Sequence, residues 1–70
     1  MSKEAQIESI YSMASLVEAK KQYTFLFHSR SDGLIGIDVL DYDTEDAVDG
    51  GWYTIDEAEE LMLNYLEQTK

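Results

Sequence analysis

The sequence contains no cysteine and no proline. Without cysteine the chain can form neither a disulfide nor a thiolate metal site, and nothing in it points to an oxidising compartment. It also lacks an apolar run long enough to span a bilayer and a stretch that resembles a signal peptide. We therefore expect a cytoplasmic protein with no membrane partner.

The sequence is also poor in basic residues, and none occurs between Arg30 and Lys70. Within that gap, the stretch from Asp38 to Glu60 holds ten carboxylates, and the net charge of the whole chain is −10. Phosphate backbones would be repelled by such a surface, so direct nucleic-acid binding is not expected.

The length of 70 residues predicts a single small acidic domain over residues 1–70. A chain of this size buries only about 60% of its extended surface, which leaves a narrow margin over chain entropy. The hydrophobic content of 44% is nevertheless ordinary for a folded protein and well above that of disordered acidic tails.

Residues 2–21 have the apolar spacing of an amphipathic helix. Ser2 is the expected amino-terminal cap, and Lys20 and Lys21 suit the negative carboxyl end of the helix dipole. Leu16 falls outside the apolar arc. The residues expected to face the core are Ile7, Ile10, Tyr11, Met13, Ala14 and Val17.

Residues 23–42 have the composition of a β-hairpin. A two-residue turn would mix apolar and polar side chains on each face, whereas a three-residue loop over Ser31–Gly33, with Gly33 left-handed, keeps them apart. One face then collects Tyr23, Phe25, Phe27, Ile35, Ile37 and Val39, with Phe27 opposite Ile37 and Phe25 opposite Val39. The other face collects Thr24, Leu26, His28, Gly36, Asp38 and Leu40.

The remaining chain is expected to form a loop and a second helix. Residues 43–51 have a loop composition, and a short third strand over Gly51–Thr54 or a second subunit should pair with the hairpin. Thr54 and Glu57 fit a capping box that opens a helix over about residues 55–68. Its core positions are Ile55, Ala58, Leu61, Met62, Tyr65 and Leu66. The predicted class is α+β, with both helices packed on one face of the sheet.

The acidic stretch from Asp38 to Glu60 has two simple explanations: its carboxylates complement a helix dipole, or they keep the protein soluble. Neither explains why no Lys or Arg is interspersed, so the favoured hypothesis is imitation of nucleic acid, aimed at a basic protein. Asp41, Asp43 and Glu45, if extended, would project to one side about 6.6–6.8 Å apart. Duplex DNA presents one phosphate per about 3.4 Å of helix axis on each strand. The expected partner-binding residues are Asp38, Asp41, Tyr42, Asp43, Glu45, Asp46, Asp49, Trp52, Asp56, Glu60 and Leu63.

An alternative hypothesis assigns the chain to structural, adaptor or antitoxin-like proteins. In that case it dimerises through the sheet face that carries Leu26, His28 and Leu40, and its charge serves only solubility.

The sequence gives little support for metal binding or for catalysis. An EF-hand loop that begins at Asp41 would need Gly where Asp46 stands and Glu where Trp52 stands. His28 is the only histidine, and its pairing with Ser29 or Ser31 and Asp38 is a trio that any soluble domain offers. We therefore expect no enzyme activity, no metal and no cofactor.

In its small size, strong acidity, lack of cysteine and α+β pattern, the chain is similar to inhibitors that phages and mobile elements direct against DNA-acting enzymes of the host. These inhibitors include nucleic-acid mimics that block restriction or CRISPR machinery. The resemblance covers the whole chain through charge and size, without a matched motif, and it assigns no residue a role.

Overall fold

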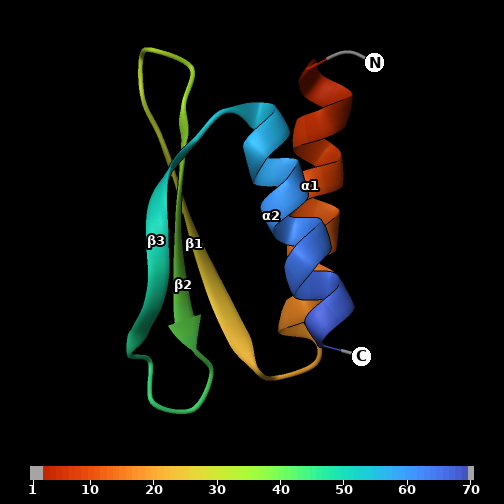
Figure 1. Ribbon diagram of the computed structural model, residues 1–70, viewed down its shortest axis with the longest axis vertical. Helices are drawn as coiled ribbons and strands as arrows, with labels where there is room; N and C mark the ends of the chain where they lie inside the picture. The colour runs from red at the N-terminus through yellow and green to blue at the C-terminus, as the bar shows by residue number, and fades with distance from the viewer. Residues whose placement is uncertain (1–2, 70) are drawn as a thin grey trace.

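The computed structural model describes residues 3–69 and contains two helices and three strands in that range. The order along the chain is α1 (Lys3–Glu18), β1 (Tyr23–Ser29), β2 (Ile35–Asp41), β3 (Ala47–Tyr53) and α2 (Ile55–Gln68). Both helices lie on the same side of the sheet, so the molecule has two layers (Figure 1). The α+β class and the placement of both helices on one sheet face are as the sequence predicts.

Helix α1 buries the predicted apolar stripe through Ile10, Met13, Ala14 and Val17. Leu16 is 55% exposed, in agreement with its position outside the stripe. The helix ends at Glu18, three residues earlier than predicted, and Lys21 adopts a left-handed φ of 60° in the turn that follows. The expected cap, Ser2, lies outside the described residues.

The β1–β2 hairpin has the predicted register. Phe25 pairs with Val39 and Phe27 with Ile37 in an antiparallel ladder. Gly33 has a φ of +85°, a conformation that side chains with a Cβ rarely adopt, and the Gly33 amide donates to the Arg30 carbonyl. This loop sets the register that places Tyr23, Phe25 and Phe27 on the sheet face that packs against the helices.

Strand β3 corrects the prediction of a loop over residues 43–51 and of a short strand over residues 51–54. It begins at Ala47, and Thr54 caps the helix that follows. It completes a sheet in the order β1-β2-β3. The register shifts between Val39 and Leu40, which pair with Asp49 and Ala47, so Val48 is an extra residue in a β-bulge.

Helix α2 begins with the predicted capping box. The Glu57 amide donates to Thr54 Oγ1 at 3.2 Å, and the Thr54 amide donates to Glu57 Oε1 at 2.9 Å. Ala58 and Met62 are buried, and the other four predicted core residues pack against them: Ile55, Leu61, Tyr65 and Leu66.

The hydrophobic core lies between the helices and the inner face of the sheet. Val17, Ile37, Val39 and Met62 are fully buried there. Tyr11, predicted to face the core, is instead 49% exposed at its margin, where its ring meets the Phe27 ring edge to face with centroids 4.7 Å apart. The outer face of the sheet carries no helix in the part of the chain that the structure describes (Figure 1).

Candidate binding surfaces

The connection from β2 to β3 is a tight acidic turn rather than an extended segment. Asp41 Oδ1 accepts hydrogen bonds from the amides of Thr44 and Asp43 at 3.0 and 2.9 Å. These two bonds, that from Thr44 first, lower the pKa of the Asp41 carboxyl below its ordinary value. Glu45 is left-handed, with a φ of 63°. The expected extended row of Asp41, Asp43 and Glu45 is therefore wrong.

The other carboxylates of this turn project into solvent. Asp43, Glu45 and Asp46 are exposed, and within residues 3–69 their carboxylates have no hydrogen-bond or ion-pair partner. Tyr42 is 42% exposed beside them, while its amide donates to the Gln22 carbonyl. The turn thus separates one carboxylate that stabilises the backbone from three that are open to a partner.

Asp49 faces the helices, because it pairs with the core residue Val39. Its carboxylate accepts a hydrogen bond from the Tyr65 hydroxyl at 3.3 Å and another from the Gly50 amide at 2.8 Å. Burial, together with the negative charge of Asp49, raises the pKa of Tyr65 to about 12. Asp49, one of the expected partner-binding residues, joins β3 to α2 through these contacts.

The outer surface of α2 presents Asp56, Glu60, Leu63 and Glu67 to solvent. Asp56 accepts a hydrogen bond from Gln6 Nε2 at 2.9 Å, which links the first turns of the two helices. The Glu60 and Glu67 carboxylates have no such partner in the described part of the chain. Leu63 is 45% exposed among them, as the sequence predicts for the polar side of the helix.

Charge is separated along the sequence. The described cationic residues belong to α1, the turn after it and the end of β1: Lys3, Lys20, Lys21 and Arg30. Residues 31–69 contain twelve carboxylates and no Lys or Arg. The acidic turn lies at one end of the long axis and the start of α2 lies toward the other end (Figure 1). The carboxylates of residues 41–67 therefore follow β3 and α2 along the molecule. We call this side, from residue 41 to residue 67, the acidic side.

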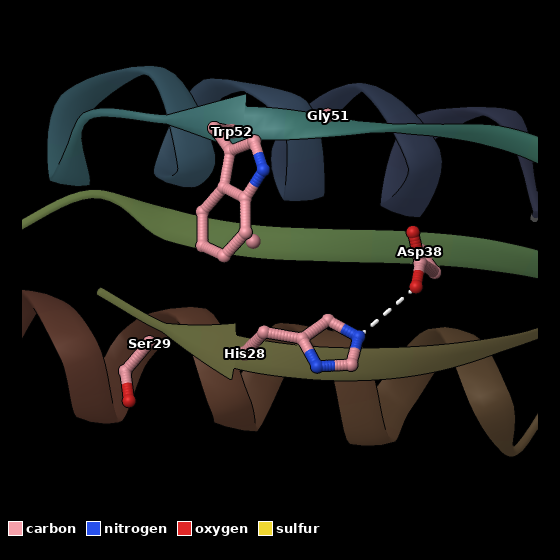
Figure 2. A pocket seen from close by; sticks show the side chains of 6 residues that line it. His28, Ser29, Asp38, Gly51 and Trp52 are labelled. Carbon is pink, nitrogen blue, oxygen red and sulfur yellow. Dashed lines mark hydrogen bonds and ion pairs between the residues drawn. The ribbon is translucent and has the colours of Figure 1, made fainter.

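The outer face of the sheet is a second exposed surface. Leu26, Val48 and Trp52 are 46%, 52% and 46% exposed there, while Leu40 is half-buried. His28 Nε2 lies 3.0 Å from Asp38 Oδ2, so a β1 side chain and a β2 side chain meet in a polar contact among these apolar groups (Figure 2).

Trp52 lies across the sheet over Gly36, its register partner on β2. A Cβ added at Gly36 would come within 2.9 Å of Trp52 Cζ3 and 3.1 Å of the His28 Cβ, so the indole occupies the space that a side chain would need. An open hollow of about 480 Å³ borders the ring, and its lining includes His28, Asp38 and Trp52 (Figure 2).

Sequence reasoning placed Gly36 on this face but missed Val48, and it missed Arg30, whose Cζ lies 4.9 Å from the centroid of the Trp52 ring. The position of Trp52 over Gly36 depends on the pairing of β2 with β3, and a strand over residues 47–53 was not predicted. The usable signal was the four-residue spacing from Val48 to Trp52, which places both side chains on one face of a regular strand.

The described residues form neither a cluster for a metal ion nor a membrane-spanning helix. No three His, Cys, Asp or Glu side chains within residues 3–69 gather in a way that could hold a metal ion. Over the same range, neither helix combines the length and the hydropathy needed to cross a membrane.

Comparison with known proteins identifies phage relatives. A family model described as a bacteriophage T4 protein covers residues 5–70. The chain is 42% identical over 62 residues, covering 89% of both chains, to a protein of Enterobacteria phage T4 described as an uncharacterized 7.9 kDa protein in the cd-pseT intergenic region. No solved structure matches the chain. The chain therefore belongs to this family of bacteriophage T4 proteins.

Proposed function

We propose that this phage protein is a non-enzymatic binding protein that occupies the basic surface of a host protein acting on DNA or RNA. The observation that carries the proposal is the acidic side, which belongs to a segment, residues 31–69, with twelve carboxylates and no Lys or Arg. Such a field concentrates a basic partner at the surface, raises its association rate and disfavours acidic partners.

The dimensions of the molecule support competition with nucleic acid. Its extents are 33 × 22 × 14 Å, and a helical turn of duplex DNA measures about 34–36 Å. The open carboxylates belong to the β2–β3 turn and to Glu60 and Glu67 on α2, so they are spread along the acidic side. A basic groove that follows one turn of a duplex could therefore contact them together.

Capture from an enterobacterial extract tests the proposal, since the T4 relative comes from a phage of enterobacteria. The immobilised protein should retain DNA- or RNA-binding proteins at low salt and release them by roughly 0.5 M salt, where the Debye length falls to a few ångströms. Mass spectrometry identifies the retained proteins, and added duplex DNA should compete with them. Retention of proteins without basic surfaces, or retention that salt does not affect, would count against nucleic-acid imitation.

A matched pair of double variants locates the contact. Glu45→Gln with Glu60→Gln removes two open charges from the acidic side, whereas Glu4→Gln with Glu8→Gln removes two exposed charges from α1. The first pair should weaken capture several-fold more than the second, because the partner approaches the acidic side. Asp41 is left intact because its carboxylate holds the turn.

The uncovered sheet face favours a second candidate, a homodimeric adaptor. Leu26, Val48 and Trp52 are about half exposed on that face, where no described helix covers them. Sedimentation equilibrium distinguishes this candidate: a dimer that Leu26→Asp dissociates, with host capture lost at the same time, would support it. Self-repulsion between two copies of charge −10 opposes such a dimer.

A further inference from the structure

We infer that the hollow beside Trp52, on the outer face of the sheet, receives an arginine side chain of the basic partner, with Asp38 as the acceptor. This inference rests on the proposed function, and it adds a specific contact to a surface otherwise described only by charge. Two features of the hollow carry it: an exposed aromatic ring packed on the sheet and a carboxylate with an open oxygen.

The aromatic ring packs directly on the backbone of β2. Trp52 lies over Gly36 so closely that a Cβ there would approach Cζ3 to 2.9 Å and Cε3 to 3.1 Å. The ring is still 46% exposed. An exposed indole that packs on the backbone in this way has the properties of an aromatic anchor, since it offers a large apolar surface at a small cost in side-chain entropy.

The carboxylate has capacity left for a cationic donor. Asp38 Oδ2 is in contact with His28 Nε2 at 3.0 Å, whereas Oδ1 accepts no hydrogen bond within residues 3–69. The side chain is 49% exposed and lines the hollow together with Trp52 (Figure 2). No Lys or Arg follows it until Lys70. Oδ1 is therefore open to an N–H group of a partner.

Arg30 shows that this indole accepts a guanidinium. Its Cζ lies 4.9 Å from the centroid of the Trp52 ring, while its Nη2 lies 3.0 Å from Asp32 Oδ2. A ring and a carboxylate therefore already hold a guanidinium beside the hollow. A partner arginine bound to Asp38 would meet the same two kinds of group, a carboxylate and the indole, and would take the place of Arg30 on the ring while Arg30 stays with Asp32. Arginine fits this pair better than lysine because its planar guanidinium stacks on aromatic faces and is weakly hydrated.

Trp52 fluorescence tests the inference directly, because Trp52 is the only tryptophan. A hexa-arginine peptide serves as the probe, and hexa-lysine has the same charge. Hexa-arginine should shift the Trp52 emission saturably and bind more tightly than hexa-lysine. Asp38→Asn should weaken hexa-arginine binding about five-fold, as expected for loss of one charge-assisted contact. Asp43→Asn, which removes an equal charge from the acidic turn, should weaken it less than about two-fold.

Gly36→Ala provides a second variant that leaves the net charge unchanged. Its Cβ would displace the indole and fill the floor of the hollow, so hexa-arginine binding should fall while hexa-lysine binding changes little. Circular dichroism and thermal unfolding confirm that each variant is folded. Equal weakening by Asp38→Asn and Asp43→Asn, or full binding by folded Gly36→Ala, would overturn the inference, because charge alone would then explain the affinity.

Host capture separates this inference from the proposed function. If the Glu45 and Glu60 double variant loses capture while Asp38→Asn keeps it, the proposed function stands and the arginine site falls. If no host protein is captured, the proposed function falls, and the peptide titration still decides whether the hollow prefers arginine. A homodimer that covers Trp52 and prevents the emission shift would overturn the arginine site.

Discussion

The Tyr65 hydroxyl of α2 donates a hydrogen bond to Asp49 Oδ2 of β3 at 3.3 Å. This contact joins the two elements of the acidic side through a polar tie between the sheet and a helix. The Tyr65 ring also meets the rings of Tyr23 and Phe25 edge to face, with centroids 5.1 and 5.6 Å away. One side chain thus couples the core to the β3 edge.

Alkaline pH should destabilise the protein through Tyr65. Burial, with a further contribution from the Asp49 charge, raises the pKa of Tyr65 to about 12, above the ordinary value of 10.0 in the unfolded chain. The unfolded state therefore loses this proton first, and the associated stability is lost as pH rises from about 10 to about 12. Urea unfolding across this range measures the decline, which should be smaller in Tyr65→Phe. An identical decline in that variant would contradict the assignment.

Backbone conformation gives two opposite predictions. Gly33→Ala should lower the free energy of unfolding by about 1 kcal/mol, because its φ is +85° although a Cβ would meet no atom within 4 Å. Lys21→Gly should raise it by up to about 1 kcal/mol, because Lys21 already has a φ of 60°. Denaturant titration of both variants tests whether these turns store the expected strain. Changes of the same sign would refute the account.

The capping box should contribute measurably to stability. Thr54→Ala removes the oxygen that accepts the Glu57 amide and should cost about 1 kcal/mol in the free energy of unfolding. Glu57→Gln is the control, because glutamine can still accept from the Thr54 amide in a capping box. Thermal unfolding distinguishes the two, and an equal loss in both variants would assign the effect to the Glu57 charge instead.

Substitution to alanine at two neighbouring positions of α2, Met62 and Leu63, should destabilise the protein by very different amounts. Met62 is fully buried, whereas Leu63 is 45% exposed one residue later. Met62→Ala should destabilise by about 2–5 kcal/mol, a large part of the stability of a domain this small. Leu63→Ala should cost well under about 1 kcal/mol. Chemical denaturation measures both, and similar losses would mean that α2 packs on a different face.

Much of the fold was predictable because its local signals agree with one another. Gly33 fixes the hairpin register, and Thr54 with Glu57 marks the start of α2, so each apolar stripe was assigned to the correct face. Strand β3 was not predictable in the same way. Asp49, Gly50 and Gly51 have a loop composition, and their extended conformation comes from pairing with β2, which is a tertiary effect.

The candidate surfaces were predictable only in composition. Sequence reasoning identified the acidic residues and exposed Trp52 and Leu63, and the structure shows each of these two side chains about half exposed. It did not show that Asp41 and Asp49 are engaged by backbone amides and by Tyr65, because those bonds depend on the turn and on the register of the sheet. The row of carboxylates therefore contains fewer open members than a count of residues indicates.

The sheet leaves both outer strands, β1 and β3, without a neighbour on one side within the described chain. Unpaired strands of this kind can recruit another molecule by backbone pairing, and like charge is one means of keeping such molecules apart. In this protein the repulsion between molecules comes from ionised carboxylates. As acid neutralises them, the molecules lose their mutual repulsion while the open strands remain, so fibrous assembly becomes accessible at the pH where the protein carries the least charge.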